Sequence, residues 1–354
     1  MSTKTNPGNF FEDFHIGQKI AHATPRTLSH GDTALYQALY GSRFALQSAD
    51  TFAQFCGLPR SPLDDLLVFH TVFGKSVPDI SLNAVANLGY AEGKFLKLVY
   101  PGETLTVNSE VIGLKENSNG QTGVVYVRTT GVNEKDEGVL SYVRWVMVRK
   151  RDIEAPAKPA VVPKLADALA PSDLRVPAKL EFDTLFETYL SGSKHLWDDY
   201  TVGEKIDHVD GMTVEEAEHM MATRLYQNTA RVHFNQFSEA QGRFGRRLIY
   251  GGHVISLARA LSFNGLANAF TIAGINGGRH VNPLFAGDTV FAWSQVLDKQ
   301  PLLHRSTKDA GLLRLRLIAT KNLPCGEFPD ADAAGKYPEN VILDFDYWAV
   351  MPRA

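Results

Sequence analysis

The sequence is poor in cysteine and has almost no excess of charge of either sign. Its 354 residues include two cysteines, Cys56 and Cys325, which lie far apart and form no CxxC pair. Two isolated thiols exclude a disulfide scaffold and favour a reducing compartment. A net charge of −3 leaves no basic footprint for a nucleic acid or an anionic membrane. The acidic residues show no clustered metal-ligand spacing, so we expect neither a metal nor another cofactor.

Long hydrophobic runs and a targeting signal are also missing. The N-terminal stretch, MSTKTNPGNFFEDFHIGQKI, has no basic segment followed by an apolar one, and no apolar run approaches the length of a membrane span. We therefore expect a cytoplasmic protein without a membrane partner. Hydrophobic residues make up 44% and charged residues 21%, an ordinary globular balance that can bury a sizeable core.

An internal repeat organises the chain. DFHIGQKI from Asp13 recurs as DYTVGEKI from Asp199, and further pairs share one constant spacing: Gly17/Gly203, Lys19/Lys205, Thr27/Thr213, Leu39/Leu225 and Tyr40/Tyr226. Other pairs match at a slightly shorter spacing: Ser81/Ser262, Asn83/Asn264, Ala86/Ala267 and Asn87/Asn268. A colinear series with drifting spacings is the mark of a duplication with small insertions. We expect one copy in residues 1–150 and the other in residues 196–354.

The stretch between the copies, residues 151–195, is rich in proline and alanine. Its prolines prevent a continuous helix or central strand, so an extended surface connector is expected. One part of it, LEFDTLF from Leu180, is apolar enough to dock on a domain.

Each copy has the same pattern of expected elements. A helix begins near Thr213, where Thr213 and Glu216 fit a capping box, and a later helix from Gly251 is apolar nearly all round, as buried helices are. Six runs alternate polar and apolar residues like half-buried antiparallel strands: 104–111, 123–132, 139–148, 289–296, 313–320 and 341–350. A buried helix wrapped by an antiparallel sheet is an α+β arrangement.

Several segments resemble the MaoC-like, or hydratase-2, branch of the hotdog superfamily. In that family a loop of the form G-D-x-N-P-L-H follows a helix, and A-H-G-M opens the central helix. Here LYQNTARVHFN from Leu225 occupies the loop position and IYGGHV from Ile249 the helix start. These segments, with YGSRFALQSAD and LLVFHTVFGKSVPDISLNAVANLGY in the first copy, are most similar to the mesaconyl-CoA (2-methylfumaryl-CoA) hydratase family, also called β-methylmalyl-CoA dehydratases. The resemblance implies a tandem double hotdog, in which two antiparallel sheets each wrap a central helix.

The resemblance places the family's catalytic histidine on His233 and its aspartate on Asn228. The family's asparagine and proline fall on Ala230 and Arg231, so the motif is matched only in part. It also implies that two hotdog units lie side by side with joined sheets, so segments 67–77 and 251–263 should pack against each other.

The first copy departs further from the motif, because Ser42 and Gln47 stand at the positions of Asn228 and His233. Neither can act as an acid or base near neutral pH, so the first copy is expected to be catalytically silent.

Hydration of an α,β-unsaturated thioester needs a donor to the thioester oxygen, a base for the water and a proton for the α-carbon. For the thioester oxygen, the family uses the backbone N–H at the start of the central helix, which is that of Gly252 here, and a glycine would let the substrate approach closely. The alternative is that Gly251 and Gly252 only shape a turn. His233 suits the base, since an imidazole accepts a proton at neutral pH. Asn228 can hold a water but carries no proton, so either His233 does all the proton transfer or another acid, such as Glu239 or the substrate's carboxylate, contributes. A helix-capping role for Asn228 is a further alternative.

Arginines are the expected contacts for the anionic groups of such a substrate. Arg231 lies shortly before His233 and could bind a carboxylate of the substrate. Arg43 of the first copy matches position 229 of the second and is expected to reach into a cavity shared by the two copies. The arginines before the glycine turn suit CoA phosphates: Arg243, Arg246 and Arg247. A solvated surface cluster is the alternative for all of them.

The function that this pattern favours is reversible addition of water to mesaconyl-CoA, giving β-methylmalyl-CoA, by a hydro-lyase whose partner is the acyl-CoA itself. The sequence leaves open whether the protein forms a homo-oligomer. A hotdog acyl-CoA thioesterase is the first alternative, although it needs a carboxylate or similar base aimed at the carbonyl carbon, and Asn228 weakens that reading. A non-catalytic acyl-CoA-binding protein is the second, because the fold alone does not separate the three.

Overall fold

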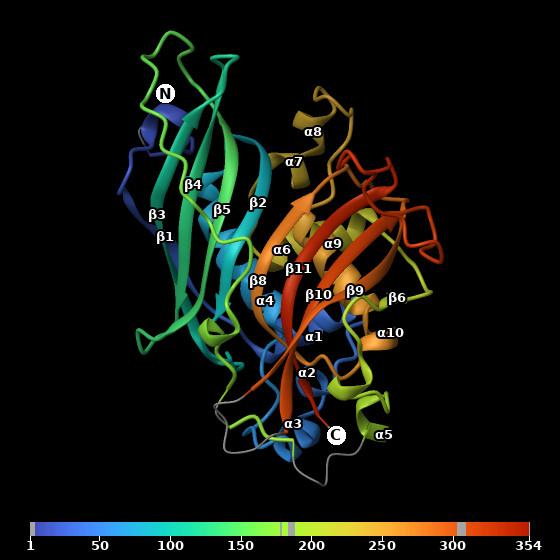
Figure 1. The fold of residues 1–354 in the computed structure, drawn as a ribbon. Helices are drawn as coiled ribbons and strands as arrows, with labels where there is room; N and C mark the ends of the chain where they lie inside the picture. Colours follow the sequence, from blue (N-terminus) through green and yellow to red (C-terminus); the bar gives the residue numbers. More distant parts are fainter. Residues whose placement is uncertain (1–3, 178, 183–187, 303–308, 354) are drawn as a thin grey trace.

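The strands of the chain form one continuous antiparallel sheet. The computed structural model describes residues 4–177, 179–182, 188–302 and 309–353. Within them the sheet has 11 strands in the order β1-β3-β4-β5-β2-β8-β11-β10-β9-β6, with β7 paired to β9 (Figure 1). The first copy supplies β1 (Lys19–Thr27), β2 (Ala84–Phe95), β3 (Thr104–Glu116), β4 (Thr122–Val132) and β5 (Gly138–Arg149). The second supplies β6 (Lys205–Asp207), β7 (Met212–Thr213), β8 (Thr271–His280), β9 (Thr289–Pro301), β10 (Ala310–Lys321) and β11 (Val341–Pro352).

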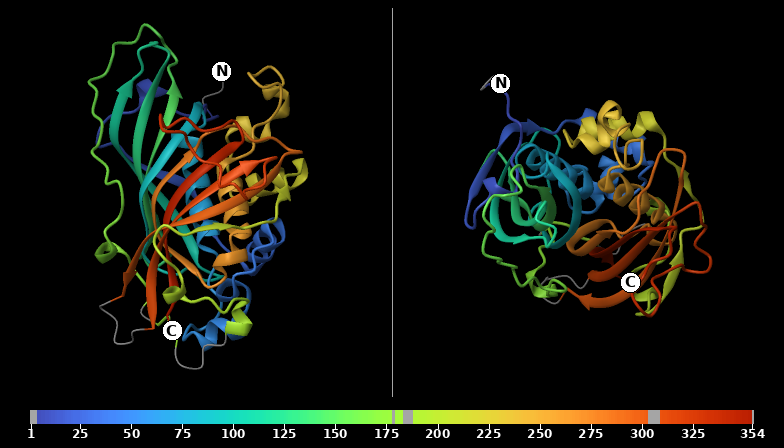
Figure 2. Two further views of the ribbon diagram at one scale, coloured as in Figure 1. Left: turned by 45° about the vertical axis from the view of Figure 1, so that its right-hand side comes forward. Right: turned by 90° about the horizontal axis from the view of Figure 1, so that it is seen from above.

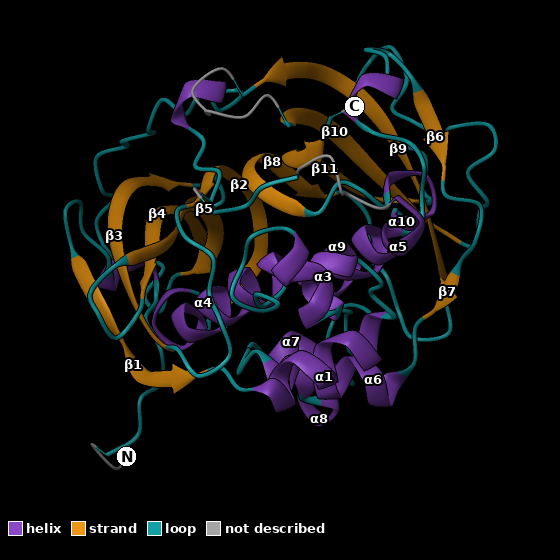
Figure 3. Cartoon of the chain, turned by 90° about the horizontal axis from the view of Figure 1, so that it is seen from below, coloured by secondary structure: helices purple, strands orange, loops and turns teal. Residues whose placement is uncertain are grey.

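Each half of the sheet curls around one central helix. Figure 3 shows α4 within one arc of strands and α9 within the other. The first copy has α1 (His30–Tyr40), α2 (Ala45–Ser48), α3 (Asp50–Phe55) and α4 (Asp65–Ile80). The second has α6 (Glu216–Leu225), α7 (Arg231–Phe234), α8 (Gln236–Glu239), α9 (Gly251–Leu261) and α10 (Phe263–Leu266), and α5 (Thr188–Ser191) precedes them. Residues 252–260 are all buried, which confirms the prediction of a buried apolar helix. The double-hotdog prediction is confirmed.

The two halves join about an approximate two-fold axis. Ala91 of β2 pairs with Gly277 of β8, and these two residues have the same spacing as Gly17 and Gly203 in the repeat. The central helices also touch, since His70 Nε2 lies 3.0 Å from Ser256 Oγ, a pair with this spacing again. This confirms the prediction that the two central helices pack together and that the two sheets join.

The matches at the shorter spacing, Ser81/Ser262 and the pairs after it, are wrong. Helix α4 begins at Asp65 and α9 at Gly251, so the helices keep the spacing of Gly17 and Gly203. Ser81 follows the end of α4, whereas Ser262 follows an earlier break after which the chain continues as α10. Both serines end a helical segment, and this shared local role explains why the sequences look alike there.

The predicted capping box at Thr213 is also wrong. Thr213 lies in β7, and α6 begins at Glu216 without a side-chain hydrogen bond at its N-cap. The first copy has such a box, in which Ser29 and Asp32 bond each other's backbone. The helices that precede the two loops are therefore capped differently.

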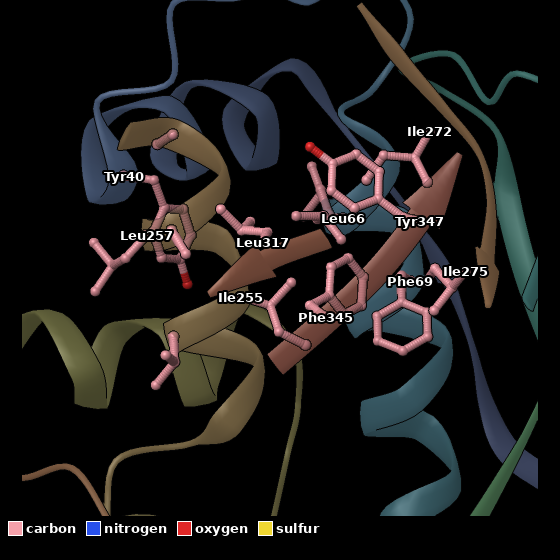
Figure 4. Close-up of a cluster of buried hydrophobic side chains, with 14 of the residues drawn as sticks. Tyr40, Leu66, Phe69, Ile255, Leu257, Ile272, Ile275, Leu317, Phe345 and Tyr347 are labelled. Carbon is pink, nitrogen blue, oxygen red and sulfur yellow. The ribbon is translucent and has the colours of Figure 1, made fainter. Parts of the chain in front are cut away.

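The largest core cluster fills the space between the sheet and the two central helices (Figure 4). Leu66 and Phe69 of α4 and Ile255 of α9 meet the inner faces of β8 and β11, where Ile275 and Phe345 are almost completely buried. Burial of each such side chain contributes about 1.5–3 kcal/mol. One core thus spans both copies and fixes their relative position.

The connector is mostly exposed between residues 151 and 168 and returns to the protein at its later part (Figure 2). Leu180 and Phe182 are buried in a second apolar cluster, which confirms docking of the start of LEFDTLF, while residues 183–187 lie outside the described part. Among the described helices, none combines the length and apolarity that a membrane crossing requires.

Candidate active site

The start of α9 presents free backbone donors next to a wall of rings. Tyr250 is its N-cap, and the N–H of Tyr250 donates to Nε2 of His219 in α6 (2.9 Å). The N–H of Gly252 belongs to the first turn, where an α-helix has no internal acceptor, and it makes no hydrogen bond within the described residues. The positive end of the helix dipole adds to its pull on an oxyanion.

The two glycines are required by the protein itself. A Cβ on Gly251 would lie 2.4 Å from the ring of His280, and one on Gly252 would lie 2.4 Å from the ring of Tyr250 and 2.6 Å from that of His70. The sequence assigned Gly252 to close approach of the substrate. In the structure, protein rings occupy the space beside both glycines, so the glycines bring the helix start against those rings.

His233 is fixed in one tautomer. It lies in α7, half-buried, and its Nδ1 is 2.9 Å from the carbonyl oxygen of Leu248. A carbonyl can only accept, so Nδ1 carries the proton and Nε2 keeps its lone pair. The N–H of Leu248 in turn donates to the carbonyl of Val232 (3.0 Å), so this segment is held from both sides. Burial lowers the pKa of His233 to about 4, which keeps the imidazole neutral at pH 7.

Asn228 holds a buried donor in the loop that leads into α7. Its side-chain Oδ1 accepts from the N–H of Ala230 (3.1 Å) and so starts the turn that leads into α7. Its Nδ2 is buried and has no partner within the described residues. The loop is pressed against α4, because a Cβ on Gly74 would lie 1.8 Å from the carbonyl oxygen of Tyr226. The first copy therefore helps to place Asn228.

Sequence reasoning missed the rings that surround this site. The ring centroid of Tyr250 lies 5.4 Å from that of His233, and its hydroxyl is 3.3 Å from His70 Nδ1. His280 Nε2 is 3.2 Å from the hydroxyl of Tyr90, which comes from the first copy. Burial, together with the nearby His233, lowers the pKa of His280 to about 4. No spacing rule in the sequence brings these residues together, since each comes from a different segment.

The corresponding region of the first copy is closed. By the spacing of the repeat, Leu66 corresponds to Gly252, and the N–H of Leu66 is already taken by Oδ1 of Asp64 (2.9 Å). Gln47, at the position of His233, donates from Nε2 to the carbonyl of Phe270 (2.8 Å). A small cavity remains there, lined by residues that include Ser42, Gln47 and Asp64. The described part of this region thus lacks the two features of the second copy, a free N–H at position 66 and an imidazole at position 47.

The structure separates the predicted arginines. Arg231, Arg243 and Arg246 are exposed beside α7 and α8, and Arg246 donates to the carbonyl of Ala286 (2.7 Å). Arg247 is ion-paired with Glu216. Arg43 stacks on the ring of Phe263 in α10 at 4.5 Å, and α10 lies at the other end of α9 from α7, which holds His233 (Figure 1). Arg43 therefore does not reach the His233 region, because the approximate two-fold axis places the loops of the two copies at opposite ends of the molecule.

A model of the mesaconyl-CoA hydratase family matches residues 2–323. The chain belongs to this family. It is 64% identical to a β-methylmalyl-CoA dehydratase of Chloroflexus aurantiacus, covering 100% of this chain and 99% of the relative. It is 61% identical to a mesaconyl-CoA hydratase of Cereibacter sphaeroides, covering 99% and 100%.

Solved structures agree with the family assignment. A putative MaoC domain protein dehydratase from Chloroflexus aurantiacus superimposes with a TM-score of 0.97 at 63% identity, covering 100% of both chains. A double-hotdog protein of Mycobacterium tuberculosis has a TM-score of 0.74 at 26% identity, covering 98% of this chain and 99% of its own.

Proposed function

We propose that this protein adds water reversibly to mesaconyl-CoA, giving β-methylmalyl-CoA, and that the second copy performs the reaction. Family membership and the identities of 64% and 61% to enzymes named for this reaction support the substrate. The observation that carries the site is the fixed tautomer of His233. Its Nδ1 is bonded to the Leu248 carbonyl, its Nε2 makes no hydrogen bond within the described residues, and its ring lies 5.4 Å from that of Tyr250 at the helix start. The enzyme is a carbon–oxygen lyase.

Each residue of the site supplies one part of the reaction. The N–H of Gly252 donates to the thioester oxygen as negative charge builds on it. The unused Nδ2–H of Asn228 holds the attacking water. His233 Nε2 takes a proton from this water while the oxygen of the water bonds to the β-carbon of the substrate. The same proton then passes from His233 to the α-carbon. Water is consumed completely, and His233 ends in its starting form.

The first copy is proposed to be silent in catalysis and to serve as a wall of the site. The capped N–H of Leu66 and the engaged amide of Gln47 support this. We retain the division into residues 1–150, 151–195 and 196–354. Arg231, Arg243 and Arg246 at the exposed rim are proposed to meet CoA phosphates, and Arg247 to hold Glu216. We also propose a cytoplasmic location.

The test is incubation of the protein with a panel of enoyl-CoA esters while absorbance of the conjugated thioester and free thiol are followed separately. Loss of absorbance without thiol release is expected for mesaconyl-CoA, and the reverse reaction should restore absorbance from β-methylmalyl-CoA. Release of thiol would identify a thioesterase instead. Binding of the ester without either change would identify an acyl-CoA-binding protein.

A further inference from the structure

A fully buried arginine lies beneath the candidate site without a carboxylate partner. Arg144 of β5 has no exposed surface, and its guanidinium donates to the hydroxyls of Ser76 (2.8 Å) and Ser81 (3.3 Å). Its central carbon lies 4.2 Å from the ring centroid of Phe73. Within the described residues, Nε makes no hydrogen bond and no carboxylate lies within 4.0 Å of the guanidinium. A buried, uncompensated charge is strongly unfavourable, so its presence calls for a reason.

Arg144 adjoins two side chains, Tyr90 and Phe73, that contact residues of the site. It pairs with Tyr90 of β2, so both side chains project from the same face of the sheet. The hydroxyl of Tyr90 lies 3.2 Å from His280 Nε2, and the ring of Phe73, which covers the guanidinium, lies 5.7 Å from the ring of Tyr250. His280 and Tyr250 both border the start of α9, where the thioester is placed.

A second unpaired polar side chain lies nearby in β2. Asn87 pairs with Val146, the next residue but one after Arg144 in β5, beside a register shift between Asn87 and Gly89. Both polar side-chain atoms of Asn87 are buried and have no partner within the described residues. An amide and a guanidinium with unused donors are suitable ligands for a carboxylate.

The second copy also holds a buried arginine, Arg259, whose guanidinium donates to the hydroxyl of Ser262 (3.0 Å) and to the carbonyl of Ala269. No carboxylate of the described residues lies within 4.0 Å of it, but its charge acts on two buried acids at a longer distance. Burial raises the pKa of Asp64 and Asp65, to about 7 for Asp65, and the charge of the nearby Arg259 opposes this rise. By the spacing of the repeat, the counterparts of these two acids are Tyr250 and Gly251. The arginine of the first copy therefore has a tyrosine and a glycine at the positions that hold these two acids in the other copy, and the charges that act on it are those of tyrosines.

We propose that Arg144, assisted by Asn87, binds the free carboxylate of the substrate and so selects dicarboxylic enoyl-CoA esters over monocarboxylic ones. The inference rests on the proposed function, which places the thioester at the start of α9. In mesaconyl-CoA the carboxylate is bonded to the β-carbon that receives the water. Holding it from the first copy fixes this carbon beside His233. The exposed Arg231, to which the sequence assigned the carboxylate, is left for CoA.

The test compares Arg144→Met and Arg144→Lys with the wild type, using mesaconyl-CoA and crotonyl-CoA, which lacks the carboxylate. In Arg144→Met, kcat/KM for mesaconyl-CoA should fall about 10- to 100-fold, the value of a lost hydrogen bond to a charged group. Turnover of crotonyl-CoA should hardly change, and Arg144→Lys should recover part of the loss. The thermal midpoint of the ligand-free protein should stay equal or rise, because an uncompensated charge is removed.

Arg259→Met is the matched control. It removes the hydrogen bonds from Arg259 to Ser262 and Ala269, so it should lower the thermal midpoint while the ratio of kcat/KM for the two esters stays that of the wild type. An unchanged ratio in Arg144→Met, or equal losses on both esters, would overturn the inference. If Arg144→Met does not fold, the ratio of kcat/KM for the two esters can be measured in Arg144→Lys and Asn87→Ala instead. A wild-type protein inactive on every enoyl-CoA would refute the proposed function instead.

Discussion

Replacement of His233 by alanine should remove catalysis and leave the fold almost intact. General acid–base catalysis contributes about 10²–10⁴ in rate, which corresponds to about 3–5 kcal/mol of transition-state stabilisation. The structural loss is the single hydrogen bond between His233 Nδ1 and the Leu248 carbonyl, worth about 0.5–1.5 kcal/mol. The assay is the initial rate of absorbance loss with mesaconyl-CoA, together with urea unfolding of the same preparation.

Gln47→Ala is the matched control, because it also removes one hydrogen bond, from Gln47 Nε2 to the Phe270 carbonyl, at the equivalent position of the first copy. The two variants should therefore be destabilised similarly, and only His233→Ala should lose turnover. Comparable rate losses would mean that both copies contribute to one composite site. Full activity in His233→Ala would refute its role as the base.

Three further predictions concern the loop, its support and pH. Asn228→Ala should lower turnover substantially while Asn228→Asp keeps appreciable activity; wild-type rates in Asn228→Ala would leave only its role in the turn before α7. Gly74→Ala should cost about 1–3 kcal/mol in urea unfolding and also slow turnover, since its Cβ would lie 1.8 Å from the Tyr226 carbonyl oxygen; a stable, fully active variant would contradict this. Stability should fall as pH drops from 7 to 4, because several histidines have folded pKa values lowered to about 2–4 by burial and take up protons in this window only when unfolded. Asp65, with its pKa raised to about 7, opposes the trend, and urea midpoints that stay constant over this range would count against the buried neutral histidines.

The repeat and the alternating strands follow from the sequence because they depend on local periodicity. All six predicted runs lie in strands, and the apolar helix from Gly251 is buried as expected. The strands that join the copies, β2 and β8, were not predicted. They contain several glycines and β2 has register shifts, so their alternation is weak, and pairing with the other copy is what defines them.

The candidate site also has a part that the sequence predicts and a part that only the fold decides. His233, Asn228 and Gly252 lie within one short stretch whose motif spacing can be read from the sequence. Whether a nitrogen keeps its lone pair, and whether a helix N–H is free or capped as in Leu66, depends on hydrogen bonds that form only in the folded chain.

The arginines show most clearly what only the tertiary structure decided. Arg43 matched the site by alignment, yet the two-fold arrangement carries it to the opposite end of α9. Arg144 carries no motif and appeared only as part of an alternating strand. Its position in the core, without a carboxylate among the described residues, is visible only after β5 has packed on α4, because burial and charge compensation are properties of the packed neighbours and not of the residue itself.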